Sequence, residues 1–357
     1  MGGYGCAGFG ASRIRWILCS ALGMTLLVVA QAAYASAVSL ERSADCLTVE
    51  QARLYMVDLI NRDRASAGLP PVALDDTATE AAQIHTNEMA QWSYLSHWDL
   101  RGRKPDQRYS ELGGQGAVFE NVYTDHTNPF LGEKVPLGRQ LLVTRRELEQ
   151  AEAWLFNQRP PNDRHRRNIL DPNHKLVGIG VSVAFDRILG RRLTLAQEFV
   201  RAPGEFAALP ADLSGAQEVK FTGRLKKGFS LRGIQICREE LPADMHPDQL
   251  NRTGCYYLPD CTVAIFRCSG SATDAALKVS RGHQGEEFSL SLKPGQSWKE
   301  GLYYVIVWVS GPAGEPFIGS TRTTRFTVAQ PVHRLAEAGA CQRSNRSSTA
   351  MIASSAP

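Results

Sequence analysis

After residue 33 the sequence lacks any apolar run of the roughly 20 residues that a membrane-spanning helix needs. The one long apolar stretch, Trp16 to Ala33, follows Arg13 and Arg15 and precedes the small residues Ala35-Ser36-Ala37. This order is typical of a cleaved secretory signal peptide, which we place at residues 1–37. We therefore expect a secreted or periplasmic protein with no transmembrane segment after cleavage, in preference to an uncleaved membrane anchor.

The sequence also lacks a strong excess of either charge, because its formal net charge is only +4. Cleavage of the leader would remove two arginines and leave +2. An excess this small argues against nucleic acid as a partner. Arg164, Arg166 and Arg167 form one local basic patch. The sequence leaves open whether this patch is simply solvated or contacts anionic headgroups or glycans.

No Cys-x-x-Cys pair occurs, which argues against a zinc site built from cysteines. Six cysteines remain after cleavage: Cys46, Cys237, Cys255, Cys261, Cys268 and Cys341. An even number in an exported chain favours disulfide bonds. We expect Cys237 to pair with Cys268 and Cys255 to pair with Cys261.

A nucleophile elbow is likewise absent, and the cysteines cluster away from the polar motifs described below. Neither a serine nor a cysteine nucleophile is therefore indicated. Ser96 adjoins His97, and we expect it to position that segment.

Residues 46–203 alternate helical and strand patterns. Thr48 with Gln51 and Thr144 with Glu147 form capping boxes ahead of apolar residues at helical spacing. Another helix is predicted to begin near Asp76 and to carry His85 on its apolar stripe, where a histidine is more often a hydrogen-bonded core residue than a ligand.

Further elements complete this pattern. The helix after Thr144 is predicted to bury Trp154, and Asn162 is predicted to cap a short helix that carries His165. Two strands are predicted over residues 177–185 and 193–200.

The same region holds an ordered set of motifs: LINRDRASAGLPPVALDD, SHWDLRGRKPDQR, VFENVY, HRRNIL and VGIGVSVAF. In this order they resemble the CAP superfamily of cysteine-rich secretory, antigen 5 and pathogenesis-related proteins, specifically its bacterial SCP-like extracellular branch. The resemblance covers residues 46–203 and implies a three-layer α-β-α sandwich whose central cavity gathers two histidines and two acidic residues.

His97 and His165 match the two histidines of that pattern, and Glu120 matches the first acid. The residue before that acid is Phe119, where the family usually has glycine. Asn157 stands at the position of the second acid, so a mechanism that needs two carboxylates is weakened. The resemblance thus implies a cavity formed by His97, Glu120, His165 and Asn157.

Three interpretations of this cavity stay open. His97 and His165 are candidate ligands for Zn²⁺, either with Glu120 as a third ligand or with Glu120 as general base on a metal-bound water. Alternatively, the three side chains form a buried hydrogen-bond network without catalysis.

The rest of the chain divides into three parts. Residues 204–214 are predicted to be a linker, and residues 331–357 a flexible tail. Residues 215–330 contain short β-branched or aromatic runs between turn signals, which predicts an all-β sandwich of immunoglobulin-like type. The overall fold class is therefore α+β. The polar excursion over residues 239–260 is predicted to be a long loop, and the domain could serve as an adhesion module, a spacer or a cap on the cavity.

These observations favour an exported, non-enzymatic CAP-domain protein. Its polar cavity would bind a metal ion, with zinc as the candidate, or a small apolar ligand. Its β-sandwich would attach to a cell-surface component or another partner. The alternative is a metal-dependent hydrolase that acts on peptides or cell-envelope material.

Overall fold

The computed structural model describes residues 45–125, 134–137, 143–186, 190–216, 218–259, 261–266, 277–283, 285–294 and 298–327. The predicted signal peptide and the predicted tail lie outside these ranges, as do Cys268 and Cys341. Within the described ranges, no helix is both long and apolar enough to cross a bilayer.

Three long helices form where the capping signals predict them. α2 (Val49–Ser66) and α5 (Arg145–Phe156) begin with complete capping boxes at Thr48 and Thr144. α3 (Asp76–Trp92) begins one residue after Asp75, whose carboxylate accepts a hydrogen bond from the amide of Ala78. The capping side chains satisfy amides that lack a partner within the helix, which fixes these starts locally.

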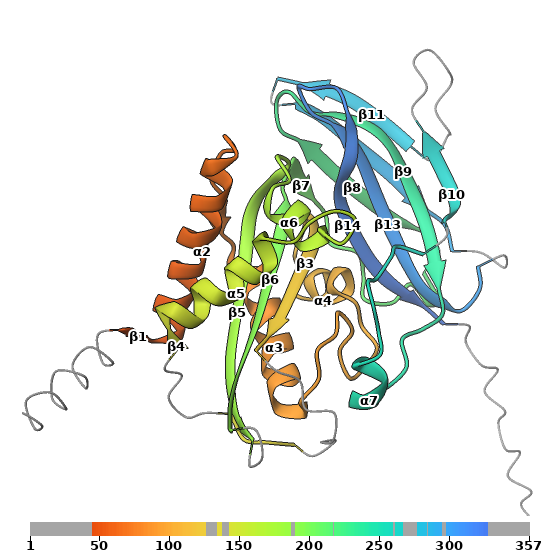
Figure 1. The fold of residues 1–357 in the computed structure, drawn as a ribbon. Helices are drawn as coiled ribbons and strands as arrows, with labels where there is room; N and C mark the ends of the chain where they lie inside the picture. Colours follow the sequence, from red (N-terminus) through yellow and green to blue (C-terminus); the bar gives the residue numbers. More distant parts are fainter. Residues whose placement is uncertain are drawn as a thin grey trace, which may run out of the picture.

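A mixed sheet with strand order β2-β5-β6-β3 forms the middle layer of the first domain. Its strands are β2 (Ala73–Leu74), β5 (His174–Asp186), β6 (Gly190–Arg201) and β3 (Ala117–Thr124). Alternate residues of β5 and β6 pack with α2 and α5 in one core cluster, while the opposite face packs against α3 (Figure 1). The expected α-β-α arrangement is therefore present.

Two glycines allow α3 to approach the sheet closely. A Cβ atom on Gly178 would lie 2.1 Å from the carbonyl carbon of Ala78, and one on Gly180 would lie 2.3 Å from the carbonyl oxygen of Ala82. Glycine is required at both positions because backbone meets backbone there.

Smaller elements complete this domain: β1 (Cys46–Leu47), β4 (Val143–Thr144), α4 (Pro105–Glu111) and α6 (Arg164–Ile169). Two predictions need correction here. The N-cap of α6 is Asp163, not Asn162. Trp154, which was predicted to be buried, is 52% exposed at the protein surface. The centroid of its ring lies 5.6 Å from the ring centroids of both Tyr123 and His165.

The second domain consists of two four-stranded antiparallel sheets, β10-β9-β13-β14 and β11-β12-β8-β7, with a shared apolar core. The first sheet contains β9 (Ser230–Glu239), β10 (Cys261–Phe266), β13 (Gly301–Ser310) and β14 (Pro316–Phe326). The second contains β7 (Gly204–Phe206), β8 (Val219–Leu225), β11 (Leu277–Gly282) and β12 (Gly285–Leu292). A short helix, α7 (Pro247–Leu250), lies in the excursion after β9. The immunoglobulin-like classification of these sheets stays a prediction.

The predicted linker is partly a strand. Residues 204–206 pair with β8 as the edge strand β7, so the second domain begins earlier than the sequence pattern suggests. The unpaired backbone groups at the edge of β8 offer this segment hydrogen bonds that composition alone does not reveal.

The disulfide prediction was wrong in both pairs, because Cys237 is bonded to Cys261. These residues are cross-strand partners in β9 and β10, with their Cα atoms 3.8 Å apart. Cys255 is an exposed free thiol.

The two domains are in direct contact (Figure 1). β14 packs against α4 and β3, and the amide of Thr323 donates to the hydroxyl of Ser110 at 3.0 Å. The excursion after β9 reaches across the first domain, where Asn251 accepts a hydrogen bond from the amide of Leu95 at 2.9 Å. The second domain therefore covers part of the first.

Candidate functional site

A pocket of about 490 Å³ lies where the predicted cavity residues meet the second domain. His97, Glu120 and His165 all line it, together with Asp106 and Asn168. The second domain contributes the remaining wall through Cys255, Tyr256, Tyr257, Leu258, Ile318 and Thr321. The convergence of three distant polar motifs on one pocket is thus present in the structure.

Glu120 lies at the base of this pocket, on β3, with only 2% of its surface exposed. Its Oε1 atom accepts a hydrogen bond from Nδ1 of His97 at 2.9 Å. Since an ionised carboxylate can only accept, Nδ1 of His97 is the donor in this hydrogen bond, and Nε2 is left for other contacts.

Arg108, on α4, holds the other carboxylate oxygen of Glu120 at 2.6 Å. The same guanidinium donates to the carbonyls of His97 and Arg103 at 2.8 and 2.9 Å. Burial by itself would raise the pKa of Glu120, but the charge of Arg108, the nearby His85 and the hydrogen bond from His97 lower that pKa to about 2. Glu120 is therefore ionised and paired at neutral pH.

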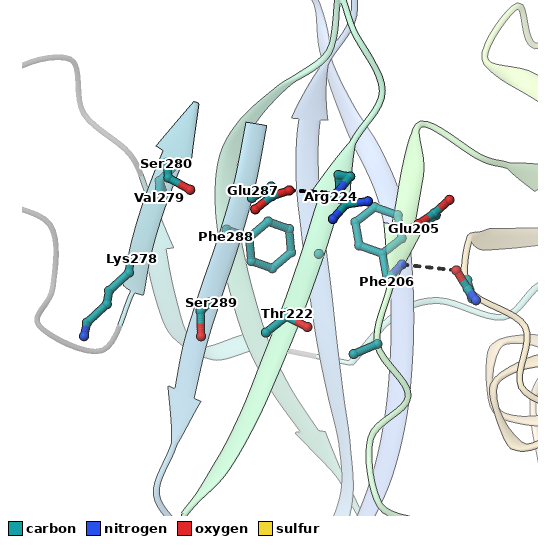
Figure 2. A pocket seen from close by; sticks show the side chains of 13 residues that line it. Glu205, Phe206, Thr222, Arg224, Lys278, Val279, Ser280, Glu287, Phe288 and Ser289 are labelled. Atoms are coloured by element: carbon teal, nitrogen blue, oxygen red, sulfur yellow. Dashed lines mark hydrogen bonds and ion pairs between the residues drawn. The ribbon is translucent and has the colours of Figure 1, made fainter. Parts of the chain in front are cut away.

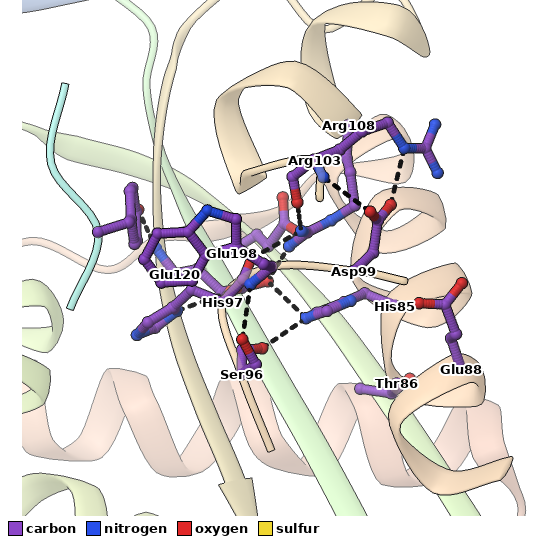
Figure 3. Close-up of polar contacts among 12 residues, drawn as sticks. His85, Thr86, Glu88, Ser96, His97, Asp99, Arg103, Arg108, Glu120 and Glu198 are labelled. Carbon is purple, nitrogen blue, oxygen red and sulfur yellow. Dashed lines mark hydrogen bonds and ion pairs between the residues drawn. The ribbon is translucent and has the colours of Figure 1, made fainter. Parts of the chain in front are cut away.

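Glu198 is a buried acid that the sequence reasoning missed. It lies opposite Glu120 in the register of β3 and β6, and its surface is 0% exposed (Figure 3). Burial, followed by the charge of Glu120, raises the pKa of Glu198 well above its usual value. Its Oε1 atom lies 3.9 Å from Nη2 of Arg108, and among the described residues neither of its carboxyl oxygens has a hydrogen-bond partner. The sequence signal was an acidic residue within the strand predicted over residues 193–200.

His85 has the structural role predicted for it. Its Nε2 donates to the carbonyl of Ser96 at 2.8 Å and lies 4.0 Å from Glu120 (Figure 3). Burial and then the charge of Arg108 lower the pKa of His85 to about 4, so the ring is neutral at physiological pH. Its hydrogen bond fixes the loop that carries His97.

His165 lines the opposite side of the pocket from α6. Its Nδ1 accepts a hydrogen bond from the side-chain amide of Gln158 at 2.7 Å, which places the proton of the neutral ring on Nε2. Burial and then the charge of His97 lower the pKa of His165 to about 4. Both predicted histidines are thus in the pocket.

Asn157 does not join them. It is the C-cap residue of α5, it is exposed, and it does not line the pocket. The position of the second acid therefore contributes nothing to the base of this pocket.

Tyr256 instead closes the pocket from the second domain. Its ring centroid lies 4.9 Å from that of His97, and its hydroxyl accepts a hydrogen bond from the amide of Glu120 at 3.2 Å. The hydroxyl of neighbouring Tyr257 accepts a hydrogen bond from Arg164 at 2.9 Å. No motif identified these tyrosines, because their relevance depends on how the two domains dock.

The arrangement does not fit a zinc ion. Among the residues that the structure describes, no group of three histidine, cysteine, aspartate or glutamate side chains is placed to hold a metal. Both oxygens of Glu120 are already engaged, one of them by the guanidinium of Arg108 at 2.6 Å. A fixed cation at this distance repels a second one. The structure therefore gives no support to His97 and His165 as zinc ligands.

A larger hollow, of about 750 Å³, lies on the second domain (Figure 2). Phe206 and Phe288 flank Gly223 there, and the charged residues Arg224 and Glu287 pair with each other at 2.8 Å. Because none of the predicted polar motifs contributes to it, we place the candidate site in the smaller pocket.

Several known proteins are similar to part of this chain. Residues 57–188 match the model of the CAP family, described as the cysteine-rich secretory protein family. The uncharacterised protein YkwD of Bacillus subtilis is 26% identical over 126 residues, which are 35% of this chain and 40% of that relative.

Two solved structures are similar over a comparable part of the chain. One is an extracellular protein containing a SCP domain from Bacillus anthracis, with 20% identity, coverage of 43% of this chain and 42% of the other, and a TM-score of 0.31. The other is an outer surface protein from Borrelia burgdorferi, with 13% identity, coverage of 43% and 97%, and the same TM-score of 0.31.

Proposed function

Because residues 57–188 form a CAP domain of the bacterial SCP-like kind, we propose that the protein is an exported ligand-binding protein and not an enzyme. Export is supported by the signal-peptide pattern of residues 1–37 and by the extracellular nature of the SCP-domain protein from Bacillus anthracis.

The observation that carries this proposal is the composition of the pocket of about 490 Å³. Its base holds one carboxylate that is already neutralised, while Val118, Phe119, Pro161, Leu258 and Ile318 supply apolar surface. Apolar surface combined with fixed polar groups is typical of small-molecule sites. The ligand would be a small apolar or aromatic molecule with one polar group that reaches Nε2 of His97.

Hydrolysis is disfavoured by the charge states in the same pocket. A pKa of about 2 makes Glu120 a weak general base at neutral pH. The raised pKa of Glu198 disfavours its ionised form, which makes it a poor replacement for the missing second carboxylate. The second domain forms one wall of the pocket. It can do so whether or not the domain also attaches to a cell surface.

Titration of the mature chain with p-cresol, indole and hexanol by calorimetry tests the proposal. Ile318→Trp fills the pocket and should weaken binding more than about tenfold, since overpacking costs roughly 1–3 kcal/mol. The matched control is Ile84→Trp on α3, where the side chain is 45% exposed. The proposal fails if none of the probes binds, or if both variants bind them as the parent does.

An activity assay addresses the enzyme alternative. Casein and a peptidoglycan suspension would be incubated with the parent, with and without a chelator. We expect no turnover. Hydrolysis that disappears in His97→Ala and in Glu120→Gln, while both variants stay folded, would overturn the proposal.

A further inference from the structure

We propose that a second pocket, at the junction of the two domains, binds a small oxyanion of carboxylate or phosphate type. This pocket has a volume of about 460 Å³ and lies between α4, the segment around Asp212 and β14. It is separate from the CAP-domain pocket, because the two pockets have no lining residue in common.

Arg322 is the residue on which the inference rests. Only 2% of its surface is exposed, and its cross-strand partner is Val305, which belongs to the core between the two sheets. Its Nε and Nη1 atoms are buried and have no hydrogen-bond partner within the described part of the chain. A guanidinium stays charged in proteins, and a buried charge without a partner is strongly unfavourable.

The acidic residues of this pocket are already engaged elsewhere. Glu111 accepts hydrogen bonds from Arg103 at 2.8 Å and from Gln107 at 2.7 Å. Asp212 accepts one from the amide of Ser214 at 2.7 Å. Among the described residues, the ion pairs of Glu111 are with Arg103 and Arg325, and neither Glu111 nor Asp212 pairs with Arg322.

Tyr109 lies near Arg322 but carries no negative charge. Burial raises the pKa of its phenol, so the group is neutral at physiological pH. The charge of Arg322 is thus left for a molecule from outside the chain to neutralise.

The remaining arginines around this pocket add to the positive charge. Arg101 and Arg325 line it together with Arg322, whereas Arg103, which also lines it, is paired with Asp99 at 2.7 Å and with Glu111 at 2.8 Å. Arg325 is half-exposed and lies 3.9 Å from Glu111. Arginine side chains present planar forks of N–H donors that match the oxygens of a carboxylate or a phosphate. An oxyanion here would contact both domains and hold them together.

The test uses the mature chain and two probes, inorganic phosphate and succinate, with chloride at equal ionic strength as the reference. Calorimetry and thermal unfolding would follow binding, since a ligand of the folded state raises the unfolding temperature. We expect saturable binding of at least one probe, and the probe that binds distinguishes phosphate from carboxylate recognition.

Arg322→Met should weaken that binding by about tenfold or more, because hydrogen bonds to charged groups contribute about 1.5–3 kcal/mol. Arg146→Met, at an exposed position of α5, is the matched control and should bind as the parent does. If Arg322→Met does not fold, the double variant Arg101→Gln with Arg325→Gln decides instead, because Arg101 is exposed and Arg325 is half-exposed.

Two results would overturn the inference. One is the absence of saturable binding of both phosphate and succinate beyond the chloride reference. The other is undiminished binding in Arg322→Met or, where that variant does not fold, in the double variant. Neither result would affect the ligand-binding proposal for the CAP-domain pocket, whose probes are uncharged.

Discussion

Replacement of Asp106 by asparagine should make the protein more stable at neutral pH. Asp106 is in the first turn of α4 and lines the CAP-domain pocket, with 4% of its surface exposed. Burial raises the pKa of this carboxyl from 3.8 to about 7, although Lys104 acts in the opposite direction. Between these two values the unfolded chain has lost the proton while the folded chain still holds it.

The sign of the effect follows from proton linkage. A raised pKa in the folded state means that the contribution of Asp106 to stability is fully present below pH 3.8 and is lost as pH rises to about 7. The difference of 3.2 pKa units, from 7 − 3.8, corresponds to about 4 kcal/mol at 1.36 kcal/mol per unit. An asparagine does not titrate, so Asp106→Asn removes this loss.

Urea unfolding at several pH values between 4 and 7 measures the prediction. The free energy of unfolding of Asp106→Asn minus that of the parent should grow with pH by about 3 kcal/mol between pH 4 and pH 7, which is most of the full difference. Asp58→Asn, at an exposed position of α2, is the control and should give a difference that stays constant. A difference for Asp106→Asn that also stays constant would refute the reasoning.

Two further predictions concern the pairings inside each domain. Arg108→Met should lower the free energy of unfolding at pH 7 by about 3–5 kcal/mol, because Glu120 is left buried without its partner. This loss should be smaller at pH 4, where the unpaired Glu120 can take up a proton. An equal loss of unfolding free energy at pH 4 and pH 7, measured by urea unfolding, would contradict the prediction. Cys237→Ser should cost about 3 kcal/mol, since the disulfide to Cys261 closes a loop with a sequence separation of 24 residues. Thiol titration would then detect one additional reactive group, and unchanged stability would count against the pairing.

Local structure followed from local residues. The capping boxes at Thr48 and Thr144 predicted the starts of α2 and α5 because the capping hydrogen bonds involve residues only three positions apart. Trp154 was wrongly predicted to be buried. Helical spacing shows which large apolar side chains share one face of a helix, but not which of them are covered by the rest of the protein. The N-cap of the short helix α6 was missed by one residue, since Asp163 makes no side-chain capping hydrogen bond.

The disulfide shows a second limit of sequence reasoning. Cys237 and Cys261 meet because β9 and β10 are neighbours in one sheet with a particular register. Cysteine spacing constrains the number of pairings but carries no information on that register.

For the candidate site, the sequence identified His97, Glu120 and His165 and placed them in one cavity. It did not identify Glu198 or Tyr256, because the first is brought to Glu120 by the pairing of β3 with β6 and the second by the docking of the β domain. It also placed Asn157 in the cavity, where the structure has an exposed helix terminus.

The sequence by itself thus determined where the helices begin, which strands alternate, and which polar residues are available to a site. Only the tertiary structure decided their charge states and partners. Glu120 and Glu198 are the same amino acid, yet the pKa of Glu120 is lowered and that of Glu198 is raised. Arg108 donates to Glu120 at 2.6 Å but lies 3.9 Å from Glu198, which is buried beside the negative charge of Glu120. A pKa depends on burial and on charges close in space, and both are set by contacts between residues far apart in the chain.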